Sequence, residues 1–140
     1  MPGPNHSVAD KLERLKLHEV DLSVGAVLET GCVYIVPLLE SLDLPADMSA
    51  SANPKSSTGR LDIFTRVITD RAQEFDKIPA GYNGPLYLEI SPRTFPIVVR
   101  RGSRLSQIRF RIGHSLLADA ELLDLHTRET LVASEAPNVS

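Results

Sequence analysis

The sequence predicts a small all-β domain with short flanking helices, arranged as a barrel or a sandwich. Seven short runs of β-forming residues follow one another along the chain, and turn residues separate them. The ten prolines and eight glycines lie mostly at the joints between these runs. A chain of 140 residues fits a single domain with one modest core, and the pattern argues against a parallel sheet.

The first element expected is a short helix over residues 8–17. Ser7 and Asp10 resemble a capping box, and Leu12 and Leu15 give the helix a weak apolar stripe. The pattern then changes to brief apolar runs that are bounded by Gly and Pro. Strands are expected at residues 26–29, 32–36, 48–52, 65–69, 86–90, 97–100 and 105–111.

A second helix is expected near the end of the chain. Asp119 can cap this helix, which continues to about His126. The residues expected to give it apolar contacts are Leu122, Leu123 and Leu125. Residues 133–140 have an irregular pattern.

Composition and charge exclude several classes of protein. The 42% hydrophobic and 24% charged content is ordinary for a soluble domain, no apolar run has the length of a membrane span, and no secretory signal is visible. We therefore expect a cytoplasmic protein. A net charge of -3 offers no general attraction to nucleic acid. Cys32 is the only cysteine, which excludes an internal disulfide, and its apolar neighbours predict that it is buried.

Positive charge is concentrated in residues 90–118, which contain no acidic residue. This stretch holds Arg93, Arg100, Arg101, Arg104, Arg109 and Arg111. Such a cluster would suit a small anion with several charges, such as a polyphosphate. Arginines that alternate outward along exposed strands would give the same pattern.

Two polar segments could bind a ligand. In residues 53–60, consecutive hydroxyls, backbone N–H groups and two cations could surround phosphate oxygens, although such loops commonly satisfy only their own backbone. Residues 102–107 form a turn that enters a strand, where backbone amides and Gln107 could contact a ligand. An ordinary β-turn is the alternative for this second segment.

The strand expected at residues 86–90 carries a carboxylate. Leu86, Leu88 and Ile90 share one face, so Tyr87 and Glu89 point to the other. A carboxylate on a strand holds its direction better than one on a loop, which a general base requires. The alternative is that Glu89 is simply solvated.

In their order and spacing these segments resemble the motifs of the dCTP deaminase and dUTPase superfamily. Residues 55–60 resemble its basic-Ser-Ser-x-x-Arg loop. Residues 78–84 resemble its aromatic-x-Gly turn, and the strand that follows carries Glu89 at the place of the deaminase glutamate. Residues 102–107 resemble its Gly-x-x-x-x-Gln motif.

The resemblance implies a distorted jelly-roll or barrel subunit of the dUTPase-like (β-clip) type, in a homotrimer with nucleotide sites at the subunit interfaces. It implies that dCTP and water give dUTP and ammonia without a catalytic metal. The zinc deaminases need an H-x-E and a P-C-x-x-C segment, which four histidines and one cysteine here cannot supply. Mg²⁺ would accompany the phosphates of the substrate.

The resemblance also assigns roles to single residues. Glu89 would activate water, Ser56 would contact the water or the leaving ammonia, and Arg60 would stabilise charge beside the water. The residues expected to bind the phosphates and the rest of the nucleotide are Lys55, Ser57, Lys77 and Gln107.

The chain departs from the family pattern in ways that predict a fragment. N-terminal and C-terminal segments that are usual in the superfamily are not found, and Pro79-Ala80 stands where deaminases often have an Asp before the turn. Residues 41–44 match the missing N-terminal segment in letters, but their place before Pro45 fits the Leu-Pro region instead. We therefore expect a dCTP deaminase-like core at residues 25–113, within a longer, two-lobed bacterial deaminase.

Four alternatives share this resemblance or compete with it. A dUTPase would use an Asp to activate water, so Glu89 favours the deaminase. A bifunctional deaminase that also hydrolyses dUTP to dUMP can use the same site. A non-catalytic nucleotide-binding or assembly module fits the missing segments, and the plainest alternative is a structural β domain.

Overall fold

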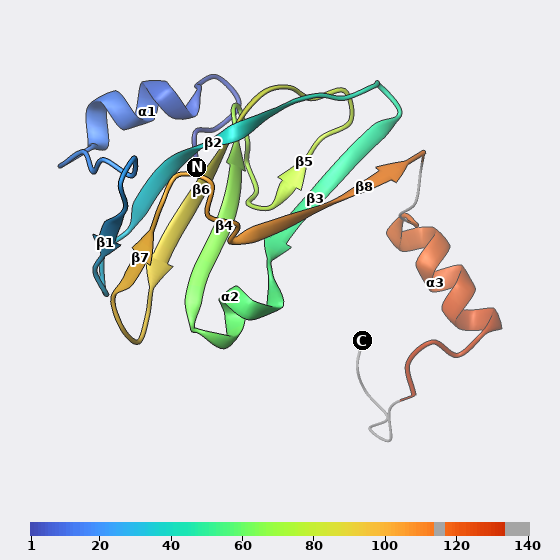
Figure 1. The fold of residues 1–140 in the computed structure, drawn as a ribbon. Coiled ribbons are helices and arrows are strands. Elements are labelled where there is room, and N and C mark those ends of the chain that lie inside the picture. Colours follow the sequence, from blue (N-terminus) through green and yellow to red (C-terminus); the bar gives the residue numbers. More distant parts are fainter. Residues whose placement is uncertain (114–116, 134–140) are drawn as a thin grey trace.

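The computed structural model describes residues 1–113 and 117–133, which fold mostly into β-strands with three short helices (Figure 1). The helices are α1 (Val8–Leu15), α2 (Ser56–Arg60) and α3 (Asp119–Arg128). The strands are β1 (Ala26–Leu28), β2 (Tyr34–Asp43), β3 (Met48–Pro54), β4 (Ile63–Thr69), β5 (Lys77–Ile78), β6 (Asn83–Pro92), β7 (Ile97–Val99) and β8 (Ser106–Ile112). They form three sheets that do not close into a barrel.

Strand β6 is the centre of a three-stranded sheet with the order β2-β6-β4. Both neighbours are antiparallel to it, and Glu89 of β6 lies opposite Arg66 of β4 and Ile35 of β2. The pairing with β2 shifts register between Pro37 and Ser41, which lets β2 continue beyond its expected end. The strand expected at residues 86–90 is thus the middle of a longer central strand.

The remaining strands form a three-stranded sheet, β5-β3-β8, and a two-stranded ribbon, β1-β7. Asn53 of β3 lies opposite Gln107 of β8. On the other side of β3, Ser51 lies opposite Lys77 of β5. Within the described residues β8 is therefore an edge strand.

The main core lies on one face of the central sheet, where alternate side chains of β4 and β6 meet those of β3. This confirms that Leu86, Leu88 and Ile90 share one face. Burying each such aliphatic side chain contributes about 1.5–3 kcal/mol. Leu28, Ala50, Ala52, Ile63, Val67, Ile78, Tyr82 and Val99 complete the buried cluster.

Helix α1 packs on the opposite face of the central sheet (Figure 1). The expected capping box is present: the Ser7 backbone N–H donates to Asp10 Oδ2, and the Asp10 N–H donates to Ser7 Oγ, both at 3.0 Å. Leu15, expected in its apolar stripe, is instead 72% exposed. A smaller cluster forms under the helix from Val8, Leu12, Ile35, Ile68, Phe75 and Tyr87.

Two details of the expected structure are wrong. Cys32 is exposed, because the chain turns at residues 30–31 and β2 begins only at Tyr34. Asp119 is the first residue of α3 and not its cap, since the Ala118 N–H donates to Glu121 Oε2 at 2.7 Å. None of the α3 leucines is fully buried, although Leu125 is half-buried. The irregular segment expected at residues 133–140 lies outside the described residues after Ala133.

Candidate functional site

Glu89 is a buried carboxylate at the centre of the molecule. It lies in the middle strand of the central sheet, points away from the main core and is 8% exposed. An ion this deeply buried is costly unless it is paired and hydrogen-bonded. Its partner is Arg66, whose Nε and Nη2 donate to Glu89 Oε1 at 3.0 and 2.6 Å.

Aromatic rings hold the Arg66 side chain in place. Its guanidinium carbon lies 3.6 Å from the centre of the Phe75 ring and 4.9 Å from that of Phe64. Guanidinium groups bind the faces of aromatic rings through cation–π attraction. Arg66 is therefore fixed from two sides, by the rings and by Glu89.

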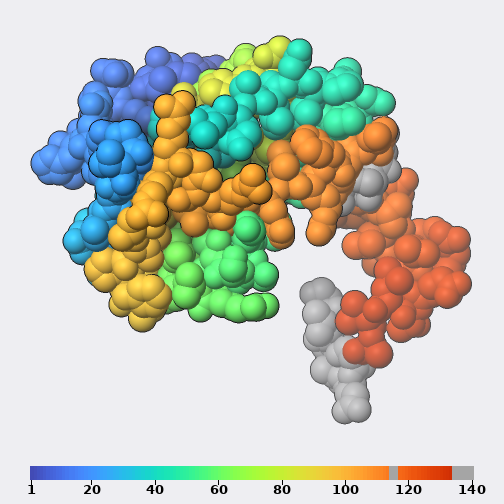
Figure 2. All heavy atoms as spheres, in the orientation of Figure 1, coloured from blue at the N-terminus to red at the C-terminus, as the bar shows by residue number. Residues whose placement is uncertain are grey.

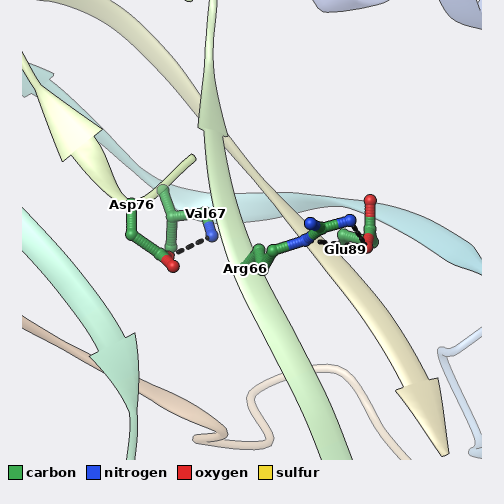
Figure 3. Close-up of polar contacts among 4 residues, drawn as sticks. All are labelled: Arg66, Val67, Asp76 and Glu89. Atoms are coloured by element: carbon green, nitrogen blue, oxygen red, sulfur yellow. Dashed lines mark hydrogen bonds and ion pairs between the residues drawn. The ribbon is translucent and has the colours of Figure 1, made fainter. Parts of the chain in front are cut away.

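Asp76 lies in the segment that connects β4 to β5, on the opposite side of β4 from Glu89 (Figure 3). Its Oδ1 accepts a hydrogen bond of 2.7 Å from the Val67 N–H. Burial raises the pKa of the Asp76 carboxyl, and the Val67 hydrogen bond and the charge of Arg66 oppose this rise. Asp76 thereby ties the segment that carries Phe75 to strand β4.

The expected phosphate loop contains a short helix. Residues Ser56–Arg60 form α2, and within it Thr58 is buried and donates from Oγ1 to the Leu105 carbonyl at 2.7 Å. Ser56, Ser57 and Arg60 remain exposed. One helical turn thus presents two hydroxyls and a guanidinium to solvent.

The structure brings this loop together with the segment at residues 102–107. The Leu105 carbonyl accepts a second hydrogen bond, from the Lys55 N–H at 3.0 Å. Gln107 follows on β8, exposed and opposite Asn53. Five of the expected residues therefore share one region: Lys55, Ser56, Ser57, Arg60 and Gln107.

This region is open and cationic. An open hollow of about 410 Å³ lies beside α2, and Arg93 contributes to its wall together with Gly59 and Asp62. Within the described residues, Arg60, Arg93 and Lys55 have no ion-pair partner. Cations without internal partners are available to an anion.

Glu89 and the loop do not contact each other within the described residues. The loop bonds to Leu105, which packs against the main core, whereas Glu89 faces the cluster under α1. Within the described residues no hydrogen bond or ion pair joins Glu89 to Ser56 or Arg60. The described part of one chain therefore shows no contact of Glu89 with Ser56 or Arg60.

Lys77 is separate from both regions. It lies on β5, on the side of β3 away from β8, and forms an exposed ion pair with Glu74. Its expected contact with the nucleotide stays a prediction.

In the part of the chain that the structure describes, no trio of His, Cys, Asp or Glu side chains is placed to hold a metal ion. No helix in that part is long and apolar enough to span a membrane.

No pattern in the sequence singles out Arg66. Arg66 and Glu89 are 23 residues apart, and their contact depends on the register between β4 and β6. A single Arg on a strand is a weak signal, because outward arginines are common on exposed strands.

Comparisons with known proteins point to one family. The model for the 2'-deoxycytidine 5'-triphosphate deaminase (DCD) N-terminal domain matches residues 1–114. A dCTP deaminase of Actinobacillus succinogenes is 27% identical over 113 residues, which are 79% of this chain and 55% of the relative. A "dCTP deaminase, dUMP-forming" of Beutenbergia cavernae is 32% identical over 102 residues, or 72% of this chain and 50% of that protein. The chain spans about half the length of these relatives.

Two solved structures are similar. The crystal structure of 2'-deoxycytidine 5'-triphosphate deaminase from Agrobacterium tumefaciens has 84% identity and a TM-score of 0.80, and the match covers 100% of this chain and 41% of that one. The native EIAV dUTPase has 15% identity and a TM-score of 0.53, with 72% and 78% of the two chains covered. The second likeness is one of fold, which is dUTPase-like.

Proposed function

Because this chain belongs to the dCTP deaminase family, we propose that it is the part of a dCTP deaminase that supplies the base and the phosphate loop. The observation that carries the proposal is Glu89, a carboxylate fixed on a central strand and buried beside a cation. A general base must hold one direction, and a rigid strand with a guanidinium bound to the carboxylate supports this.

The proposed reaction is hydrolytic. A water molecule attacks C4 of cytosine and gives a proton to Glu89, and the C4–N bond then breaks as the amino group leaves as ammonia. One proton of the water ends on the ammonia and the other on ring N3, so Glu89 is ionised again. Ser56 would contact the water or the leaving ammonia, and Arg60 would stabilise the charge that develops.

The triphosphate is proposed to bind at the loop. Lys55, Ser57 and Gln107 offer an ammonium, a hydroxyl and an amide in one region, a set that suits phosphate oxygens. Mg²⁺ would reach the site with the phosphates of the nucleotide, because these residues are donors and not the carboxylates that Mg²⁺ prefers. Lys77 is proposed to contact the nucleotide from its separate position.

A homotrimer is proposed as the active form. The separation of Glu89 from the loop supports this, because a complete site would then need Glu89 of one subunit and Ser56 and Arg60 of its neighbour. Closed rings with head-to-tail contacts bring such different surfaces together.

Replacing Glu89 with Gln tests the assignment of the base. We expect the variant to bind dCTP in calorimetry but to lose turnover by about 100-fold or more, since a general base contributes about 10²–10⁴-fold. The exposed Glu13→Gln variant is the matched control and should keep full turnover. Near-normal turnover in Glu89→Gln would remove Glu89 from the role. A wild-type chain that binds dCTP without turnover would point instead to a non-catalytic nucleotide-binding module.

A second candidate is a deaminase that also forms dUMP. It is favoured by the relative whose name includes "dUMP-forming", which is 32% identical over 102 residues. Chromatography of the products formed from dCTP and Mg²⁺ distinguishes the two. Accumulation of dUTP supports the simple deaminase, and direct appearance of dUMP supports the bifunctional one.

A further inference from the structure

We infer that Arg66 is a positioning residue for the proposed reaction: it binds one carboxylate oxygen of Glu89 and directs the other, Oε2, to the attacking water. The inference rests on the proposed function and deepens it. It concerns a residue that does not itself touch the substrate.

The hydrogen bonds to Glu89 are strongly asymmetric. Both donors of Arg66 that reach Glu89 bind the same atom, Oε1, at 3.0 and 2.6 Å. Oε2 accepts no hydrogen bond from the described residues. Thr69 Oγ1 is the fully buried side-chain atom without a hydrogen-bond partner among the described residues, so Oε2 of Glu89 is not fully buried.

Arg66 is itself held rigidly enough to impose this asymmetry. Its guanidinium stacks on Phe75 at 3.6 Å and lies 4.9 Å from the Phe64 ring centre. Phe75 packs in turn against the buried cluster under α1. The side chain of Arg66 is 33% exposed and that of Glu89 is 11% exposed, so water competes weakly for the Glu89 oxygen. Rotation of the Glu89 carboxylate would break two charge-assisted hydrogen bonds at once.

The asymmetry gives the two carboxylate oxygens of Glu89 different roles. Oε1 shares its electron density with two N–H donors, which leaves Oε2 as the more basic oxygen. When water attacks, its O–H bond breaks and the proton binds Oε2. Arg66 stays on Oε1 while the proton passes on to the leaving amino group, so the carboxyl group keeps its direction throughout. Arg cannot give up a proton itself, which confines the proton to Glu89.

A purely structural ion pair is the alternative, since buried pairs can often be replaced by apolar residues with little loss of stability. The two roles predict different kinetics. A positioning role lowers kcat and leaves KM for dCTP unchanged, because the ground-state complex does not use the direction of Oε2. A structural role lowers the thermal stability and changes neither kinetic constant of the folded fraction.

The experiment compares Arg66→Met, Arg66→Lys and the control Arg14→Met, which removes an exposed arginine from α1. We expect Arg66→Met to lower kcat by up to about 100-fold, the cost of misplacing a reacting group by roughly 1 Å. Arg66→Lys keeps a cation beside Glu89 and should restore part of kcat. Arg14→Met should match the wild type. Equal kcat in Arg66→Met and the wild type, with Glu89→Gln inactive, would overturn the inference while the proposed function stands.

A second measurement does not need turnover. In nitrogen-15 NMR spectra of the wild-type chain, the Arg66 Nε–H should exchange slowly with water, and Glu89→Ala should make that exchange fast. Fast exchange in the wild type would overturn the inference. A wild-type chain without turnover would contradict the proposed function, and the Nε–H signal would then decide by itself whether the Arg66–Glu89 pair holds.

Discussion

At the scale of single residues, burial and hydrogen bonding shift the pKa of the Asp76 carboxyl in opposite directions. Burial has the larger effect and raises the pKa of Asp76 above the ordinary value of 3.8. The Val67 N–H and the charge of Arg66 lower it by less. The folded protein therefore binds this proton more tightly than the unfolded chain does.

The stability that depends on Asp76 should fall as pH rises. Between about pH 3.8 and the raised pKa the folded state holds more protons than the unfolded state, so the free energy of unfolding decreases through this window and is level above it. Asp76→Asn keeps an oxygen that accepts from Val67 but has no proton to lose. Urea denaturation from about pH 3 to about pH 7 should show the variant gaining stability relative to the wild type as pH rises.

Asp10 provides a control of opposite sign. Its hydrogen bonds to Ser7 lower the pKa of the Asp10 carboxyl, so the stability it contributes is present at neutral pH and is lost as pH falls. Asp10→Asn should therefore lose stability relative to the wild type as pH rises. The same slope in Asp10→Asn and Asp76→Asn would contradict the physical cause given for Asp76.

At the scale of elements, the turn into β6 depends on a glycine beside a buried tyrosine. Tyr82 is 7% exposed, accepts from the Asp70 N–H at 3.2 Å and donates to the Pro85 carbonyl at 2.6 Å. A Cβ at Gly84 would lie 2.8 Å from the Tyr82 hydroxyl oxygen and 3.1 Å from Cζ. The aromatic-x-Gly pattern thus has a steric cause.

Gly84→Ala should destabilise the protein by about 1–3 kcal/mol, the usual cost of forcing extra volume into a packed site. Gly59→Ala is the matched control, because nothing lies within 4 Å of a Cβ at that position in α2. Alanine there should be neutral or stabilise by up to about 1 kcal/mol. Urea denaturation of both variants measures the difference. Equal stability of Gly84→Ala and the wild type would show that Tyr82 can move without loss.

The elements that the sequence predicts are those with local causes. The capping box of Ser7 and Asp10 and the inward face of β6 follow from short-range patterns, and both are confirmed. Helix α2 was not predicted, because its Ser, Thr and Gly residues favour turns and its position depends on the bond from Thr58 to the distant Leu105. The contact of Arg66 with Glu89 also depends on tertiary pairing.

At the scale of the whole molecule, β8 is the surface at which we expect a neighbouring subunit to pack. It is an edge strand within the described residues, and Ile108, Phe110 and Ile112 on it are 38%, 47% and 69% exposed. The segment that contains β8, orange in Figure 2, lies at the molecular surface. Exposed apolar edge strands tend to pair or to be covered.

Phe110→Lys should weaken the proposed homotrimer and leave the fold of the subunit intact. A half-exposed side chain contributes little to the core, whereas a lysine on an edge strand opposes pairing with another chain. Sedimentation velocity should show a smaller species for the variant than for the wild type. Leu17→Lys is the control, since Leu17 is 88% exposed on a segment after α1. A variant that sediments like the wild type would exclude Phe110 from the interface.

The separation of Glu89 from Ser56 and Arg60 gives the sharpest test of the assembled molecule. Within the described residues no hydrogen bond or ion pair joins Glu89 to Ser56 or Arg60, so a complete site is expected only between subunits. Glu89→Gln and Arg60→Met should each be inactive alone, because each variant lacks one half of every site. The two should complement each other when they are mixed and refolded together.

In an equal mixture, a site has a one-in-two chance of receiving an intact Glu89 and the same chance of receiving an intact loop. About a quarter of the sites should then be complete in randomly mixed trimers, and dUTP formation should recover to about that fraction of the wild type. Refolding either variant alone is the control and should give no recovery. If both halves of a site came from one chain, every chain in the mixture would carry a defective site and no turnover would return, which would place Glu89 and the loop in the same subunit after all.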